Sequence, residues 1–162
     1  SAIINGGVLY KPYIVKSLNE PETNTVIKEN KPIAIRKVIS EETSEKVRYA
    51  LESVVANGTG RPAYISGYRV GGKTGTAQKV KDGKYMVGNY IVSFIGFLPA
   101  DDPQVVVYVA IDNAKGVTQY GGTVAAPIVR NIMLDIIDIL EIEKRDNGLP
   151  KSYNYLDRKW YK

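Results

Sequence analysis

The sequence contains neither cysteine nor histidine among its 162 residues. The absence of cysteine excludes disulfides, thiolate nucleophiles, iron–sulfur clusters and cysteine-based zinc sites. The absence of histidine excludes a Ser-His-Asp triad and histidine metal sites, and it removes the side chain that most often moves protons near neutral pH. Because the carboxylates are also dispersed, we expect no bound metal and no cofactor. Any catalysis must depend on Lys, Tyr, Ser, Thr or carboxylate side chains.

Long apolar runs and basic runs are absent as well. The longest apolar segments, residues 91–98 and 105–111, have the length of strands, whereas a membrane span needs ~20 residues. Lys and Arg number 22 against 17 Asp and Glu, a net charge of +5, but no run of five basic residues occurs. We therefore expect no nucleic-acid partner, and membrane attachment only through a segment outside this sequence.

The length suits one compact domain, and a hydrophobic fraction of 44% suffices for an ordinary core. The opening residues, ending in Asn5-Gly6-Gly7, are typical of the last turn of a helix. No helix start precedes them, so we expect a piece of a longer chain. The polar residues 144–162 are predicted to be a tail or linker after a domain that spans residues 1–143.

The first part of the chain predicts short strands followed by a helix. Residues 8–18 indicate an extended edge segment, and residues 25–28 and 34–39 indicate short strands. Ser40 can cap a helix that ends at Asn57-Gly58. Apolar residues at helical spacing predict its core face: Val47, Leu51, Val54 and Val55.

The remaining part predicts an antiparallel sheet and a second helix. Residues 68–78, 89–98 and 104–112 indicate three strands, joined by turns at 79–84 and 99–103, which is the pattern of a meander. A helix is predicted from about residue 123 to 143. Its isoleucines define an apolar side that we expect to pack on the sheet: Ile128, Ile132, Ile136 and Ile139. The fold class is therefore α+β, an antiparallel sheet packed by helices.

Two motifs overlap in the middle of the chain. Residues 67–74 match the phosphate-binding pattern G-x-x-x-x-G-K-[ST], and an apolar strand ending in Asp112 resembles the metal-binding strand of such proteins. A phosphate-binding loop needs a helix that starts at its lysine. A hairpin signal follows Lys73 instead, and the predicted sheet is antiparallel rather than parallel. The nucleotide-binding interpretation remains a remote alternative.

The second motif is Lys73-Thr74-Gly75, followed by Thr76. On an edge strand, a glycine lets a peptide-like substrate lie against the backbone as an added strand. The N–H of Thr76 can then stabilise a developing oxyanion. Lys73 and the hydroxyls of Thr74 and Thr76 can bind a substrate carboxylate. Gln78 and Tyr120 are weaker candidates for substrate contact.

These residues, with several others, resemble the C-terminal part of the transpeptidase domain of class B penicillin-binding proteins. The resemblance rests on residues 58–60, 67–68 and 72–77, then 93–99 and 120–127. Within this class the chain most resembles the sporulation-specific type. The resemblance implies the fold shared by penicillin-binding proteins and serine β-lactamases. It also implies an extracytoplasmic, membrane-anchored enzyme that cross-links peptidoglycan stem peptides ending in D-Ala-D-Ala and is acylated by β-lactams.

The family carries three motifs, S-x-x-K, S-x-N and K-T-G, of which only the third stands in its place here. No serine is followed three positions later by lysine, so the nucleophile is missing. Ser17-Leu18-Asn19 and Ser152-Tyr153-Asn154 match S-x-N at the wrong places. We expect this chain to be inactive alone, to need the N-terminal part of its domain as partner, and to dimerise or swap a strand without it. A β-lactamase or β-lactam sensor domain is the main alternative.

Overall fold

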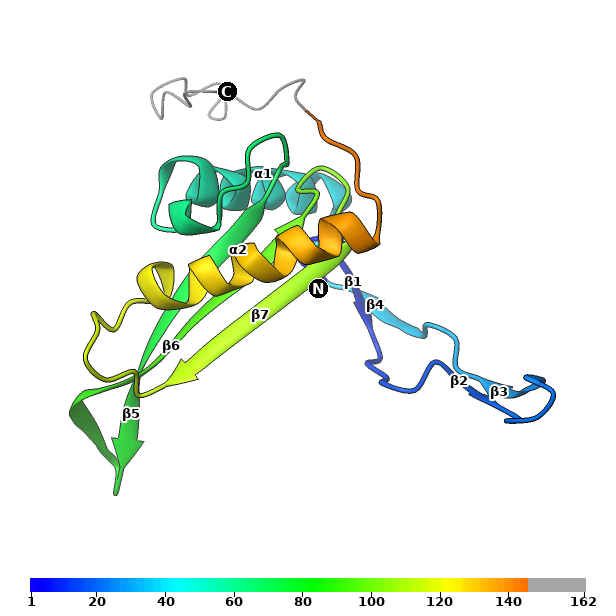
Figure 1. Cartoon of the computed structure of the whole chain (residues 1–162), viewed down its shortest axis with the longest axis horizontal. Coiled ribbons are helices and arrows are strands. Elements are labelled where there is room, and N and C mark those ends of the chain that lie inside the picture. The colour runs from blue at the N-terminus through cyan, green and yellow to red at the C-terminus, as the bar shows by residue number, and fades with distance from the viewer. Residues whose placement is uncertain (146–162) are drawn as a thin grey trace. The chain divides into compact units, whose positions relative to one another are not determined.

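The computed structural model describes residues 1–145 (Figure 1). The chain divides into two compact units, Ser1–Lys46 and a second unit that begins at Val47. The predicted tail, apart from Lys144 and Arg145, lies outside the described residues. No helix within residues 1–145 combines the length and the apolar character that crossing a membrane requires.

The first unit contains two separate two-stranded antiparallel sheets. One pairs β1 (Val8–Tyr10) with β4 (Ala34–Lys37), and the other pairs β2 (Ser17–Asn19) with β3 (Val26–Glu29). The prediction of one extended segment over residues 8–18 was therefore wrong. The break follows Tyr10 and contains Pro12, which has no N–H to donate to a ladder. The opening residues form a hydrogen-bonded turn, in which Gly7 N–H donates to the Ala2 carbonyl.

Helix α1 (Glu41–Asn57) begins and ends where the sequence predicts. The hydroxyl of Ser40 accepts the N–H of Thr43 at 3.0 Å, which confirms the N-terminal cap. Val55 is buried, and the other residues of the predicted core face are half-buried. A short 3-10 helix (η1, Arg61–Ala63) follows.

The second unit contains the predicted meander. Strands β5 (Gly71–Lys81), β6 (Lys84–Leu98) and β7 (Val105–Asp112) are antiparallel and lie in that order. The turn between β5 and β6 is only Asp82-Gly83, so the predicted turn over residues 79–84 was too wide. Both residues have positive φ, as a two-residue hairpin turn of the primed type requires, and this lets the strands continue to the turn.

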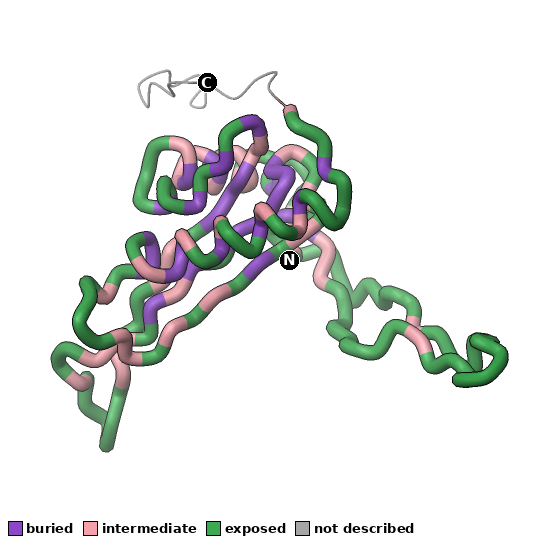
Figure 2. Tube along the Cα trace, viewed as in Figure 1, coloured by how far each residue is buried: buried purple, intermediate pink, exposed green. Residues whose placement is uncertain are grey.

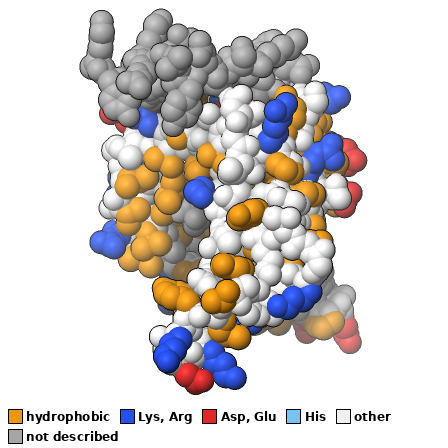
Figure 3. All heavy atoms as spheres, turned by 90° about the vertical axis from the view of Figure 1, so that its left-hand side faces the viewer, with side chains coloured by type: hydrophobic (Ala, Val, Ile, Leu, Met, Phe, Trp, Pro, Cys, Tyr) orange, Lys and Arg blue, Asp and Glu red, His pale blue; other side chains and the backbone are white. Residues whose placement is uncertain are grey.

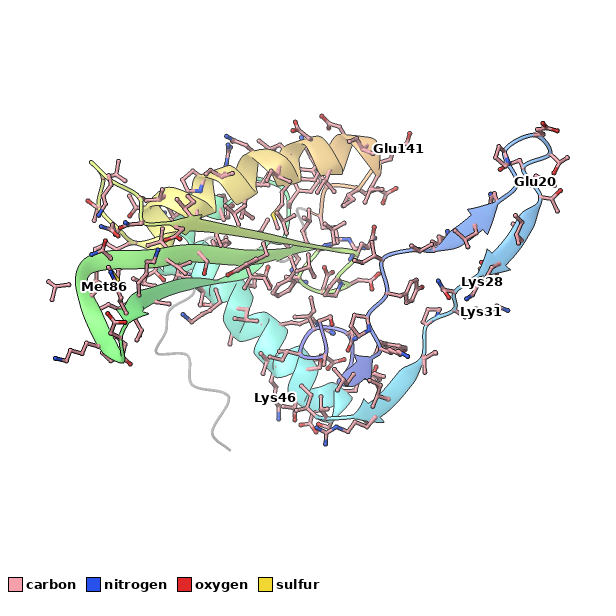
Figure 4. The ribbon with its side chains drawn as sticks, turned by 90° about the horizontal axis from the view of Figure 1, so that it is seen from below. Glu20, Lys28, Lys31, Lys46, Met86 and Glu141 are labelled. Carbon is pink, nitrogen blue, oxygen red and sulfur yellow. The ribbon has the colours of Figure 1, made fainter. Side chains whose placement is uncertain are left out.

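Helix α2 (Gly121–Ile139) runs along one face of this sheet (Figure 4). Of the isoleucine side predicted to pack on the sheet, Ile136 packs against the core, but the prediction was wrong for Ile128, Ile132 and Ile139, which are exposed. The buried row is offset around the helix and is smaller in its first half: Ala125, Ala126 and Val129, followed by Met133 and Ile137. The helix lies so close to β6 that a Cβ on Gly96 would touch Met133 and Val129. The close approach depends on Gly96, which has no side chain to separate Val129 and Met133 from the strand.

Buried positions concentrate on β6, α2 and the loop before β5 (Figure 2). Phe94 and Leu98 of β6 lie fully buried in this core with Val129 and Met133 of α2. The opposite face of the sheet is different, because Ile95 is 41% exposed and Tyr108 61% exposed there. Phe97 on this same face is only 3% exposed, so within residues 1–145 the face is covered at the end of β6 and open around Ile95 and Tyr108.

Candidate active site

The motif Lys73-Thr74-Gly75 lies near the N-terminal end of an extended edge strand. All residues from Gly71 to Lys81 belong to β5, and β5 pairs with β6 on one side only among the described residues. This confirms the expected extended conformation. It also removes the nucleotide-binding alternative, because the helix that a phosphate-binding loop requires at Lys73 is a strand.

The pairing of β5 with β6 determines which backbone groups face the free edge. Gly75 lies directly opposite Ser93. A Cβ on Gly121 would touch the carbonyl oxygens of both residues. Two opposed carbonyls that meet at one point both face the space between the strands, so Gly75 and Ser93 form the hydrogen-bonded pair. Since alternate residues of a strand face opposite edges, the N–H groups of Thr74 and Thr76 are directed to the free edge.

Packing against the neighbouring strand also requires a glycine at position 75, which the sequence analysis did not predict. A Cβ at this position would collide with the hydroxyl of Ser93 on the neighbouring strand. Any larger residue would push Ser93 away or distort the edge. The glycine therefore keeps the strand flat at the centre of the motif, in addition to leaving room for a ligand.

Lys73 brings its charge to the same edge. Its Nζ donates a hydrogen bond to the Thr74 carbonyl at 2.9 Å, and the side chain is exposed. The Thr74 side chain points toward the start of α2, where its Cγ2 lies 3.3 Å from the position of a Cβ on Gly122. Thr76 is exposed. The free edge thus combines a cation with outward N–H groups, on a strand that also carries the hydroxyls of Thr74 and Thr76.

The two weaker candidates occupy different environments. Gln78 donates its side-chain amide to the Met86 carbonyl at 3.1 Å, so the amide is engaged within the hairpin whose Met86 is labelled in Figure 4. Tyr120 is the N-cap residue of α2 and is 62% exposed. It directly precedes Gly121, which packs on the carbonyls of Gly75 and Ser93. The structure therefore leaves the Tyr120 side chain exposed, next in sequence to a residue that packs on the motif, whereas the amide of Gln78 is engaged within the hairpin.

The end of the sheet beyond this motif exposes both apolar and basic side chains. Figure 3 views this end, with the charged β5–β6 turn at the bottom and exposed apolar side chains above it. The apolar group includes Val80, Tyr85 and Val87, which are 58%, 72% and 89% exposed. No group of three or more acidic residues within residues 1–145 is arranged to hold a metal ion.

A partly buried ion-pair network supports the segment that leads into β5, and sequence reasoning missed it. Arg69 donates from Nε and Nη2 to the two carboxylate oxygens of Glu52, at 2.9 and 2.7 Å. Glu52 is only 4% exposed. Arg69 also lies 3.4 Å from Asp101, which accepts a hydrogen bond from Arg145 at 2.6 Å. The signal in the sequence was an acidic residue on the half-buried side of a helix, three positions before Val55.

The hydrogen bonds and charges in this network favour the ionised forms of Arg69 and Asp101. The hydrogen bonds from Arg69 to Glu52 raise the pKa of the Arg69 guanidinium above its ordinary value, although burial opposes this. Burial would raise the pKa of Asp101, but the hydrogen bond from Arg145 and the charge of Arg69 outweigh it, so that this pKa lies below its ordinary value. The network joins α1, the segment before β5 and the β6–β7 turn.

The family described as "Penicillin binding protein transpeptidase domain" matches residues 1–134. The chain belongs to this family. It is 63% identical over 159 residues to stage V sporulation protein D of Bacillus subtilis, which confirms the resemblance to the sporulation-specific type. That match covers 98% of this chain and 25% of the relative. The probable peptidoglycan D,D-transpeptidase PenA of Neisseria flavescens is 41% identical over 108 residues, 66% of this chain and 27% of the relative.

Solved structures agree with the fold. Penicillin-binding protein 3 of Mycobacterium tuberculosis, complexed with ampicillin, matches with a TM-score of 0.77 and 31% identity, over 93% of this chain and 35% of that one. Its complex with aztreonam matches with a TM-score of 0.74 and 32% identity, over 89% and 34% of the two chains. The predicted α+β fold of a penicillin-binding transpeptidase domain is thus confirmed. This chain spans about a quarter of the length of the curated relatives described above.

Proposed function

We propose that this chain is the substrate-binding part of a peptidoglycan D,D-transpeptidase. Its parent, the longer protein that would also carry the S-x-x-K motif, cross-links stem peptides ending in D-Ala-D-Ala. The observation that carries the proposal is the motif Lys73-Thr74-Gly75 on an edge strand, in a chain of the transpeptidase family. An extended peptide can bind such an edge as an additional strand.

In this proposal the edge of β5 binds the ligand and stabilises the reacting carbonyl. Lys73 and the hydroxyls of Thr74 and Thr76 bind the terminal carboxylate of the ligand. Because Thr76 directs its N–H to the free edge, this group can donate to the oxyanion that forms on the carbonyl. A donor of this kind contributes about 100- to 1000-fold in rate.

The bond changes need a serine from the parent. Its oxygen attacks the carbonyl carbon, the C–N bond of the D-Ala-D-Ala peptide breaks, and terminal D-Ala leaves with a proton on its nitrogen. An amine of a second stem peptide then attacks the ester, forms the cross-link and releases the serine. β-Lactams would acylate the same serine while lying on the same strand. Tyr120 and Gln78 remain weaker candidates for ligand contact.

The surroundings of the chain form part of the same proposal. The domain spans residues 1–143, and the rest of the transpeptidase domain covers the exposed sheet face that includes Ile95 and Tyr108. The domain acts on the extracytoplasmic side of the membrane, anchored by a segment outside this sequence. Alone, the chain is inactive, and we expect it to dimerise or swap a strand through its open edges.

Covalent labelling with a fluorescent penicillin tests the proposal. We expect the parent to be labelled and the isolated chain to remain unlabelled on a denaturing gel, because the nucleophile is absent from this sequence. Lys73→Ala in the parent should reduce the labelling rate at least about tenfold, since one desolvated charge-assisted contact is lost. Lys84→Ala, at an exposed position of the same hairpin, is the control. Labelling of the isolated chain, or an unchanged rate in Lys73→Ala, would contradict the proposal.

A further inference from the structure

The loop between β7 and α2 is attached to the edge of β6 near the proposed substrate strand. Asn113, the first loop residue, donates its N–H to the Tyr90 carbonyl at 2.8 Å, which extends the β6–β7 ladder by one residue. Asn113 and Gly116 both have positive φ, and the chain turns away from the sheet after Asn113. Beyond this point the loop can no longer pair with β6 through its own backbone.

The side chain of Gln119 takes over that pairing. Its Oε1 accepts the N–H of Tyr90 at 3.2 Å, and its Nε2 donates to the Gly88 carbonyl at 2.9 Å. A carboxamide offers one acceptor and one donor group, as a peptide unit of a strand does, so this side chain substitutes for a missing strand residue. Lys115 adds a weaker attachment, from Nζ to the Asn89 side-chain oxygen at 3.3 Å. The loop is thus anchored to residues 88–90 from three positions, Asn113, Lys115 and Gln119.

Only one residue separates Gln119 from Gly121, the glycine that packs on the motif strand β5. Tyr120 lies between Gln119 and Gly121, and a Cβ on Gly121 would touch the carbonyls of Gly75 and Ser93. The carbonyl of Tyr120 accepts the N–H groups of Thr123 and Val124, both at 3.0 Å, at the start of α2. Tyr120 is therefore fixed on both sides, directly before the glycine that packs on Gly75, and its side chain is 62% exposed.

We propose that Gln119 is a positioning residue for ligand specificity. Its two hydrogen bonds to β6 hold Tyr120 as a wall beside β5, against the part of a ligand that extends past the reacting carbonyl. This inference rests on the proposed function, because it assumes that the ligand lies along β5. It assigns Gln119 no contact with the ligand and no part in the bond changes.

The inference predicts a loss that depends on the size of the ligand. Two β-lactams serve as probes, benzylpenicillin with its aromatic side chain and 6-aminopenicillanic acid without one. In the full-length parent, Gln119→Ala should lower the second-order acylation rate constant for benzylpenicillin about tenfold, since a misplacement of about 1 Å can cost 100-fold. The rate constant for 6-aminopenicillanic acid should change less than about twofold, because Thr76 and Lys73 are untouched.

Three further variants separate positioning from general stability. Gln119→Met keeps the length of the side chain but loses both hydrogen bonds, and it should behave as Gln119→Ala does. Gln119→Glu retains an acceptor for Tyr90 N–H and should recover part of the rate for benzylpenicillin. Tyr120→Ala should reproduce the loss, and adding Gln119→Ala to it should cause little further change, because both act through one wall. Gln104→Ala, exposed at the other end of the β6–β7 pair, is the matched control.

The outcomes are distinguishable from a failure of the proposed function. If the wild-type parent is not acylated at all, the proposed function fails. If it is acylated and Gln119→Ala leaves the benzylpenicillin rate unchanged, or lowers both rates equally, Gln119 does not position a specificity wall and the inference is overturned. Additive losses in the Gln119→Ala, Tyr120→Ala pair would overturn it as well.

Discussion

The two compact units of this chain differ in how far the apolar side chains of their strands are buried. In the second unit, alternate residues of β6 are buried under α2, with Phe94 and Leu98 both fully enclosed. In the first unit, strands β3 and β4 are exposed along their whole length, including Ile27 at 70% and Ile35 at 57%. Both units contain antiparallel strands of β-branched residues, so residue type does not separate them. What separates them is whether a helix covers the strands.

That difference bears on where a rigid binding strand can be built. A two-stranded hairpin without a covered face is marginally stable by itself, whereas a sheet of three strands packed by a helix can be stable. The motif residues lie on such a sheet, at its open edge. The open edge supplies unpaired N–H groups, and the packed face holds them in place.

The largest contrast is expected from truncating one apolar side chain in each unit. Phe94→Ala should lower the free energy of unfolding by about 3–5 kcal/mol, because a fully buried ring leaves a cavity. Ile27→Ala should change it by less than about 0.5 kcal/mol, since the side chain is already exposed. Urea unfolding of the parent or of the chain measures both. Equal costs would show that the hairpin of the first unit is covered in solution.

The next largest effect concerns the buried carboxylate of the second unit. Glu52→Gln should destabilise the fold by about 3 kcal/mol, because Arg69 keeps only its longer ion pair with Asp101 and loses the one at the site where Glu52 is 4% exposed. Glu45→Gln on the exposed part of the same helix is the control. The double replacement Glu52→Leu with Arg69→Met should recover much of the loss. A cost for Glu52→Gln as small as that of the control would contradict the network.

The smallest predicted effect is a pH dependence at Asp101. Its pKa in the fold lies below the ordinary value of 3.8, so the folded state favours the carboxylate. The resulting stabilisation is present above the unfolded pKa and is lost as the pH falls through the folded pKa. Asp101→Asn should therefore cost about 0.5 kcal/mol at pH near 6 and progressively less below about pH 4. Glu29→Gln in the exposed hairpin serves as the control, and a pH-independent cost for Asp101→Asn would contradict the assignment.

Local patterns predicted the elements better than their contacts. The cap at Ser40, the meander and the extended motif strand followed from turn residues and alternation, which are local properties. The inward face of α2 did not follow, because the helix has two apolar rows at helical spacing, and the buried row contains Val129, Met133 and Ile137. That choice depends on how closely the helix approaches Gly96, which is a property of the packed structure.

The candidate site divides in the same way. The site residues of β5 could be predicted from the motif and from the resemblance to the transpeptidase family, because they occupy consecutive positions in the sequence. The hydroxyl of Ser93 against Gly75 and the anchor at Gln119 could not, because each depends on pairing between distant segments. The Glu52–Arg69 pair likewise joins residues that neither motif nor periodicity connects.

Hydrogen exchange at the amide of Thr76, measured in the parent before and after acylation by benzylpenicillin, tests the central claim most directly. If this amide lies on the free edge of β5 and binds the acyl carbonyl, its exchange is fast before acylation and slows strongly afterwards, while Gly75, paired with Ser93, is slow throughout. If the Thr76 amide is already as protected as that of Gly75 without ligand, or exchanges at the same rate after acylation, the strand edge is not the binding element described here.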